Sequence, residues 1–176
     1  MNSRILILLS TLLLFSLTAV ADKTVGQGID DSTIQAEVKA KLLGDDFFGG
    51  LDANLEVRKG VVQLGGWVEK AEESTGPAKI AATVDGVVKV DNQLHEKRGK
   101  ASIGQKVDDG LITTSTKAAI SDMDLGTGFK VNVDTYNGVV LLTGFVNSKE
   151  DHDAVGKKAA GVDNVKDVIN GTYVLN

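Results

Sequence analysis

The sequence contains no cysteine, so no disulfide, thiolate site or lipidated N-terminal cysteine can form. It contains only one proline, Pro77, and only two histidines, His95 and His152. Neither histidine has suitable neighbours at a metal-ligand or catalytic-triad spacing, so both are expected as solvated surface side chains. The sequence therefore predicts a protein that is not an enzyme and that holds neither a metal ion nor a cofactor.

The sequence also lacks an excess of basic residues. It has 19 basic and 24 acidic residues. Arg4 is the only charged residue among the first 21, and an apolar run over residues 5–17 leads to the small-x-small site Ala19-Val20-Ala21. We expect residues 1–21 to be a signal peptide cleaved after Ala21, because the run is short for a membrane span. The mature chain is then expected to have no membrane span. Its net charge is 18 − 24 = −6, and this negative charge argues against a nucleic-acid partner.

One apolar stretch occurs twice, as residues 60–68 (GVVQLGGWV) and 138–146 (GVVLLTGFV), an offset of 138 − 60 = 78. Side chains alternate along a strand, so one face of each copy should point to a core. These faces consist of Val62, Leu64, Gly66 and Val68, and of Val140, Leu142, Gly144 and Val146. The two core-face glycines are expected to let a packed helix approach the strand. The recurrence in register predicts a duplicated domain.

A helix is predicted before each copy. Apolar or small residues recur every four positions, as Ile34, Val38 and Leu42 and as Ile112, Thr116 and Ile120. Asp30 or Asp31 should cap the first helix, and Asp108 and Asp109 the second. The second helix is expected to be the weaker one, because it contains three consecutive Thr or Ser residues at 113–115.

The turns Lys59-Gly60 and Asn137-Gly138 predict antiparallel hairpins. A second helix follows each hairpin. Ser148 is its expected cap in the second copy, whereas Pro77 should either kink the helix in the first copy or restart it. A third strand then follows and can run parallel to a neighbour. Each repeat is thus predicted to be an α+β domain in αββαβ order, with two helices covering a small three-stranded mixed sheet.

These motifs resemble the BON-domain family. The resemblance rests on the Asp-capped first helix, on Gly-Val-Val-x-Leu-x-Gly-x-Val in both copies, and on Val84-Asp85-Gly86-Val87 with its counterpart Val162-Asp163-Asn164-Val165. Gly60, Gly66, Gly138 and Gly144 are the structural glycines of this motif. We assign domains to residues 29–97 and 106–176, with a linker over 98–105. The resemblance implies a non-enzymatic periplasmic protein of osmotic or envelope stress that contacts phospholipid or guards unfolded envelope proteins.

Two surface features are candidates for such contacts. The opposite face of the repeated strand carries Trp67 in the first copy and Phe145 in the second. It is exposed unless the two domains cover each other's faces or the helices pack on this side. Basic residues gather in the linker, namely Lys97, Arg98, Lys100 and Lys106, which are either simply solvated or bind anionic phospholipid. Four such charges give only about 4 kcal/mol, so either an inserted aromatic side chain or several copies bound side by side are expected to add to them. The alternative is a chaperone-like module that binds envelope proteins through exposed sheet faces.

Overall fold

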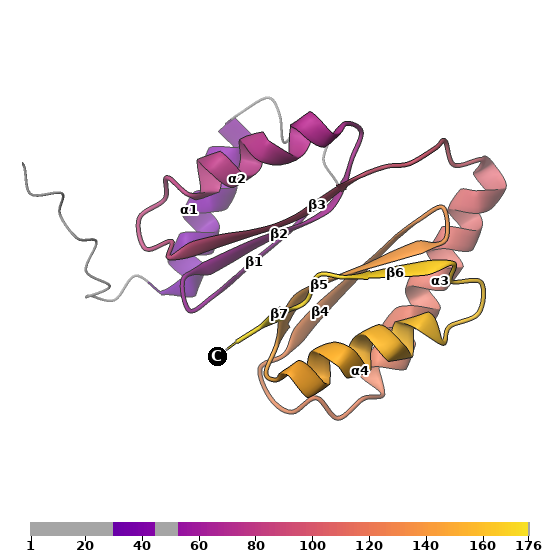
Figure 1. Cartoon of the computed structure of the whole chain (residues 1–176). Coiled ribbons are helices and arrows are strands. Elements are labelled where there is room, and N and C mark those ends of the chain that lie inside the picture. The colour runs from indigo at the N-terminus through magenta and orange to yellow at the C-terminus, as the bar shows by residue number, and fades with distance from the viewer. Residues whose placement is uncertain (1–29, 45–52, 176) are drawn as a thin grey trace, which may run out of the picture.

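The computed structural model describes residues 30–44 and 53–175 (Figure 1). The expected signal peptide, 1–21, and most of the loop after the first helix, including Phe47-Phe48-Gly49-Gly50, lie outside the described residues. The first repeat contains α1 (Asp31–Gly44), β1 (Ala53–Arg58), β2 (Val61–Val68), the 3-10 turn η1 (Ala71–Ser74), α2 (Thr75–Ala81) and β3 (Lys89–Glu96). The second contains α3 (Ile103–Ser121), β4 (Lys130–Tyr136), β5 (Val139–Val146), α4 (Lys149–Ala160), β6 (Asp167–Asn170) and β7 (Tyr173–Val174).

The two repeats have the same sheet topology and register. The repeated strand is central in each, antiparallel to the strand before it and parallel to the strand after it, in the orders β1-β2-β3 and β4-β5-β6. Leu55 pairs with Leu64, and Val133 pairs with Leu142 at an offset of 142 − 64 = 78. The predicted hairpins and the parallel third strand are confirmed.

The second sheet counts four strands, not three, because its third strand is interrupted between β6 and β7. At the interruption Thr172 turns its hydroxyl to Asn170 Oδ1, 2.8 Å away. Gly171 packs so closely on Gln93 that a Cβ atom would lie 2.6 Å from Gln93 Oε1. His152 was expected as a solvated surface side chain. It contacts this interruption instead, since its Nδ1 lies 2.8 Å from the Thr172 hydroxyl.

Each repeat has its own core. The predicted stripes of the first helices are buried, with Ile34, Val38 and Leu42 on α1 and Ile112, Thr116 and Ile120 on α3. They pack with the core faces of β2 and β5, where Leu64 and Leu142 are fully buried. Fully burying such a side chain contributes about 1.5–3 kcal/mol, so these positions hold each repeat together.

The helix starts only partly match the prediction. The Asp30 carboxylate caps α1 by accepting the Thr33 N–H at 2.8 Å, whereas Asp31 accepts the N–H groups of the β1–β2 turn. The prediction that Asp108 and Asp109 cap the first helix of the second repeat is wrong. Helix α3 begins at Ile103, and Ser102 caps it in a capping box with Gln105.

The second helices differ between the repeats because of the single proline. In the first repeat the chain makes the 3-10 turn η1, and α2 starts at Thr75, so Pro77 lies in its first turn. The restart alternative is therefore the correct one, since Pro lacks an N–H that the first turn does not use. In the second repeat Ser148 Oγ accepts the Asp151 N–H at 3.0 Å, which confirms the predicted cap of α4.

The two sheets pack face to face, and the helices cover their outer faces, giving four layers in the order helix, sheet, sheet, helix (Figure 1). The face of β2 and β5 opposite to the core is therefore covered by the other repeat. Gln63 and Phe145 are each 1% exposed, and Gly65 packs against Thr143. Of the alternatives for this face, mutual coverage by the two domains is the one found.

The contact between the sheets is nearly two-fold symmetric. The Asn54 side-chain amide donates to Asp134 at 2.5 Å, and the equivalent Asn132 amide donates to Glu56 at 3.4 Å, with offsets 132 − 54 = 78 and 134 − 56 = 78. Gly65 and Thr143 are themselves equivalent positions (143 − 65 = 78), so they lie on the symmetry axis. This is the geometry of an isologous dimer interface, here made within one chain.

The repeated glycines all have positive φ values, a backbone conformation that favours glycine. Gly144 has φ +107°, and a Cβ atom there would lie 1.9 Å from the Lys130 carbonyl oxygen on β4. Gly66 has φ +144°. Gly60 and Gly138 have φ +72° and +81° in the hairpin turns, where only glycine avoids a steric penalty. The expectation that the core-face glycines admit a helix is therefore wrong at Gly144, where the close neighbour is a strand.

Candidate functional site

An aromatic cluster forms where the first repeat meets the second near the linker. The ring of Trp67, at the end of β2, lies 6.2 Å from that of His95 and 5.8 Å from that of Tyr136. His95 belongs to β3 and is half-buried, so the expectation of a solvated surface side chain is wrong for it. Burial holds the pKa of the His95 imidazole below its usual value, so the ring is neutral at pH 7.

The linker is tied to this cluster. Tyr136 donates its hydroxyl proton to the Gly99 carbonyl at 2.5 Å, and the Asn137 side chain donates to the Arg98 carbonyl at 2.9 Å. Two β4–β5 hairpin residues thus hold the linker backbone against the second repeat. The described linker is short, running from Lys97 to Ser102, because β3 extends to Glu96 and α3 begins at Ile103.

The four predicted basic residues have different surroundings. Lys97 Nζ makes an ion pair with Glu69 at 2.6 Å and lies 5.8 Å from the centroid of the Tyr136 ring. The hydrogen bond from Lys97 holds the pKa of the Glu69 carboxyl below its usual value. Arg98, Lys100 and Lys106 are exposed and make no ion pair among the described residues. Three of the four charges are therefore available to an external anion.

The two predicted aromatic contacts also differ. Phe145 is buried, with its ring edge-on to Tyr173 at 5.8 Å, so it does not reach the surface while the sheets are packed together. Trp67 is half-buried, and its indole Nε1 is buried without a hydrogen-bond partner.

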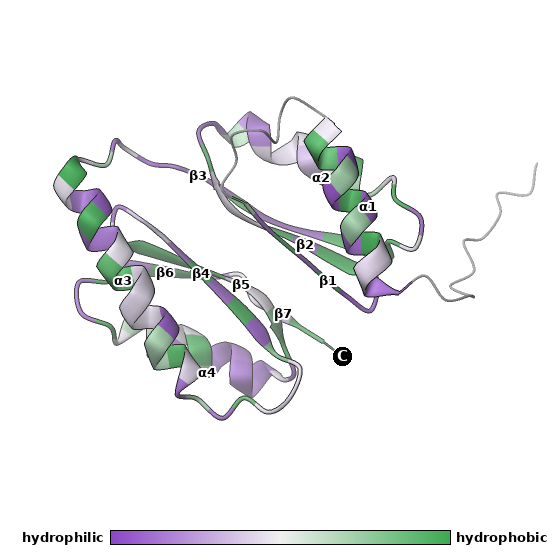
Figure 2. Ribbon diagram, turned by 180° about the vertical axis from the view of Figure 1, so that it is seen from behind, coloured by the Kyte–Doolittle hydropathy of each residue, from purple (hydrophilic) through white to green (hydrophobic). Residues whose placement is uncertain are grey.

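An exposed apolar stripe on α3 was not predicted from the sequence. Ile103, Val107 and Leu111 recur every four residues and are 86%, 60% and 64% exposed. Asp109 accepts the Asn137 and Gly138 N–H groups of the β4–β5 turn, at 2.8 and 2.7 Å, so the preceding turn of α3 lies beyond the end of the hairpin. Apolar and polar residues alternate along this part of α3 (Figure 2). The Ser102-x-x-Gln105 pattern could have revealed that a helix begins here and carries this stripe, because a capping box marks a helix start.

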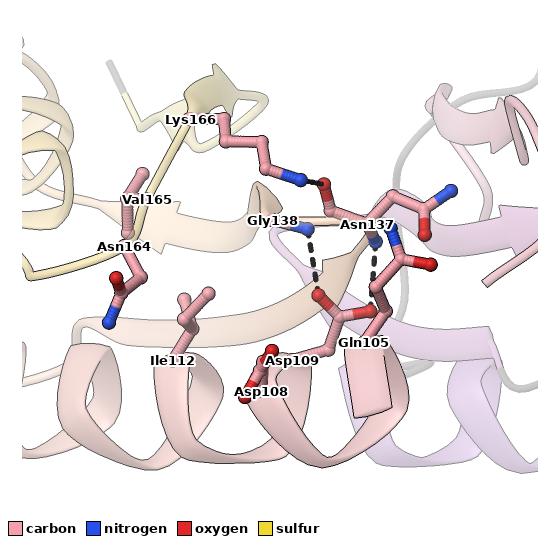
Figure 3. A pocket seen from close by; sticks show the side chains of 9 residues that line it. All are labelled: Gln105, Asp108, Asp109, Ile112, Asn137, Gly138, Asn164, Val165 and Lys166. Atoms are coloured by element: carbon pink, nitrogen blue, oxygen red, sulfur yellow. Dashed lines mark hydrogen bonds between the residues drawn. The ribbon is translucent and has the colours of Figure 1, made fainter. Parts of the chain in front are cut away.

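A cavity of about 400 Å³ lies between α3, the β4–β5 turn and the segment before β6 (Figure 3). Its central polar groups satisfy one another. The Asp109 carboxylate binds the two turn N–H groups, and Lys166 donates its ammonium to the Asn137 carbonyl at 2.9 Å. Asp31 holds the corresponding turn of the first repeat in the same way. This arrangement is therefore a structural brace between helix and hairpin.

Among the described residues, no group of three or more His, Cys, Asp or Glu side chains could hold a metal ion. In the same part of the chain, no helix combines the length and apolarity that crossing a bilayer requires.

Comparison with known proteins agrees with the duplicated fold. A model of the BON domain matches residues 30–98 and 108–176. The chain is 35% identical over 147 residues to osmotically-inducible protein Y of Escherichia coli (strain K12), covering 83% of this chain and 73% of that protein.

Two solved structures of CdsD, a structural protein of the type III secretion system of Chlamydia trachomatis, share 18% identity with the chain. The likenesses cover 84% and 85% of this chain and 68% and 66% of theirs; at a TM-score of 0.33 they support no inference. The two family matches span 69 residues each, at the same offset of 78 that relates the two sheets. The chain therefore belongs to the BON-domain family, of which it carries two domains.

Proposed function

We propose that this chain is a non-enzymatic, periplasmic osmotic-stress protein that attaches to anionic phospholipid through the first turns of α3 and the adjoining linker. The relation to osmotically-inducible protein Y supports the stress role. The expected signal peptide supports the location. The observation that carries the membrane proposal is the exposed stripe Ile103, Val107 and Leu111 beside exposed basic side chains.

The stripe supplies the apolar contribution that the basic residues alone lack. Burying an exposed Val, Leu or Ile side chain contributes about 1.5–3 kcal/mol, so three partly exposed ones contribute about 4 kcal/mol. Arg98, Lys100 and Lys106 add about 1 kcal/mol each near an anionic surface, and Asp108 on the same helix turn removes about as much as one of them. The sum of about 6 kcal/mol corresponds to a dissociation constant of tens of micromolar.

The geometry favours this segment over the aromatic residues as the inserted group. A helix that lies in a membrane surface needs an apolar side flanked by basic residues, and the start of α3 has both. Phe145 is buried between the sheets and would need their separation. The sheet faces on which the chaperone hypothesis relied are covered by each other, so that hypothesis requires the same separation.

The test is co-sedimentation of the mature chain with vesicles of phosphatidylglycerol and, separately, of phosphatidylcholine. We expect salt-sensitive binding to the first and none to the second. Val107→Glu should weaken binding at least tenfold, because it removes apolar area and adds a negative charge, and Lys100→Gln with Lys106→Gln should weaken it comparably. Leu43→Glu is the matched control, since Leu43 is 62% exposed on α1 of the other repeat. Equal effects of Val107→Glu and Leu43→Glu would refute the assignment to α3.

A further inference from the structure

The near two-fold symmetry allows the two ends of the interface between the sheets to be compared within one molecule. Lys89 and Asp167 are equivalent positions at the starts of β3 and β6, since 167 − 89 = 78. His95 and Tyr173 are likewise equivalent, since 173 − 95 = 78. The ring pairs confirm the match. The Trp67 ring lies beside that of His95 at one end, and the ring of its equivalent Phe145 meets Tyr173 edge-on at the other.

At the Tyr173 end the chain provides its own cation. Lys89 Nζ lies 4.6 Å from the centroid of the Tyr173 ring and 3.4 Å from its hydroxyl oxygen. An ammonium over an aromatic face is attracted by the negative potential of the ring. A cation–π contact therefore fills this end of the interface.

At the His95 end the same place is open. A cavity of about 210 Å³ is lined by, among others, Trp67, His95, Tyr136, Glu96, Arg98 and Asp167. Here the residue equivalent to Lys89 is an acid, Asp167. Within the described parts of the chain, neither Asp167 nor Glu96 makes an ion pair. The cavity thus combines aromatic rings with two exposed carboxylates that make no ion pair, where its counterpart holds an ammonium group.

We propose that this cavity binds a small zwitterion through its ammonium group, with the cation against Trp67 and beside Asp167, and with the anionic end at Arg98. The neutral imidazole of His95 adds no opposing charge, since burial lowers its pKa. Aromatic faces combined with a carboxylate are the usual recognition elements for quaternary and methylated ammonium groups. Arg98 favours a zwitterion over a bare cation, because its guanidinium attracts a carboxylate or phosphate. The ligand is either a free solute or a phospholipid headgroup, which share this chemistry.

Trp67 is the only tryptophan in the chain, so its fluorescence reports directly on the cavity. We expect saturable changes on titration with trimethylglycine and with phosphocholine. The control ligand is 3,3-dimethylbutanoate, which has the shape of trimethylglycine with carbon in place of the charged nitrogen, and it should bind at least tenfold more weakly. Titration with phosphatidylcholine vesicles, with and without trimethylglycine as competitor, distinguishes a headgroup from a free solute. Binding to either form supports the proposal.

The variants test the charge. Asp167→Asn should weaken trimethylglycine binding about tenfold, and Asp167→Lys should abolish it by placing an ammonium in the cavity as Lys89 does at the other end. Asp163→Asn makes the same charge change at an exposed site outside the cavity and should bind like the unmodified chain. Circular dichroism confirms that each variant is folded. Absence of a saturable change, or equal binding of 3,3-dimethylbutanoate, or equal binding by Asp167→Lys, would overturn the proposal.

The outcome is separable from that of the membrane proposal. Val107 and Lys106 on α3 do not line the cavity, so their substitution should leave trimethylglycine binding unchanged. Asp167→Asn should likewise leave attachment to phosphatidylglycerol vesicles unchanged.

Discussion

Gln63 is the buried polar side chain that joins the two sheets, and its substitution tests their packing. Its amide nitrogen donates to Asp91 at 2.7 Å and to the Gly171 carbonyl at 2.8 Å, and its oxygen accepts the Gly144 N–H. All the hydrogen-bonding groups of the amide are therefore used, and two of the three partners belong to the second repeat.

We expect Gln63→Met to cost about 3–5 kcal/mol of unfolding free energy. Methionine keeps the approximate volume, so little cavity energy is added. Three hydrogen bonds are lost at about 1 kcal/mol each, and the Gly144 N–H remains buried without a partner, which adds about 1–2 kcal/mol. This is a large part of the roughly 5–15 kcal/mol that stabilises a typical domain.

The assay is urea denaturation followed by Trp67 fluorescence and by far-ultraviolet circular dichroism. The Trp67 ring lies 5.8 Å from that of Tyr136 in the other repeat, so its fluorescence reports separation of the sheets. In Gln63→Met the fluorescence transition should come at lower urea than the loss of secondary structure. Gln35→Met is the control, because the Gln35 side chain makes one hydrogen bond, to Leu55 within its own repeat, and should cost about 1 kcal/mol. If Gln63→Met costs no more than Gln35→Met, hydrogen bonding across the sheets does not hold the repeats together.

Four further substitutions test other features. Gly144→Ala should destabilise the folded chain by more than about 2 kcal/mol, because Gly144 has a positive φ and lies close to the Lys130 carbonyl. Gly110→Ala, in open space on α3, should stabilise it by about 0.5–1 kcal/mol. Thermal unfolding measures both effects. Asp109→Ala should cost about 2 kcal/mol in urea titrations, since it leaves two turn N–H groups without an acceptor, and a neutral result would show that the brace is dispensable. The lowered pKa of His95 means that below about pH 6.5 the unfolded chain binds a proton more readily than the folded one, so stability should fall as the pH drops. His95→Gln should make that decline below about pH 6.5 shallower.

The topology of each repeat was predictable because its signals are local. Alternation along residues 60–68 and 138–146 distinguishes the two strand faces, and the turns at 59–60 and 137–138 set the register. The positive φ values of Lys59 and Asn137, 48° and 51°, are those that such two-residue turns require. The offset of 78 then transfers each assignment from one repeat to the other.

The candidate sites were less predictable because they depend on how the repeats meet. Alternation shows that Gln63 and Phe145 lie on the face opposite to the core, but not what covers that face. The proximity of Trp67 and Tyr136 arises only when the sheets pack together. The start of α3 was misplaced for a different reason. Aligning the repeats placed the start of α3 at Asp108 by analogy with Asp30. Helix α3, however, has five more residues than α1, 19 against 14.

The pair on the symmetry axis makes each repeat selective for the other. A side chain on the axis of a true dimer would face its own copy, but here Gly65 faces Thr143, and a Cβ atom at Gly65 would lie 2.5 Å from the Thr143 methyl carbon. Two second repeats meeting in this way would place threonine against threonine and clash, whereas two first repeats would leave a gap between glycines. The Thr143 side chain fits against Gly65 only when a first repeat meets a second one. Joining both repeats in one chain therefore gives each domain a nearby partner of the right kind.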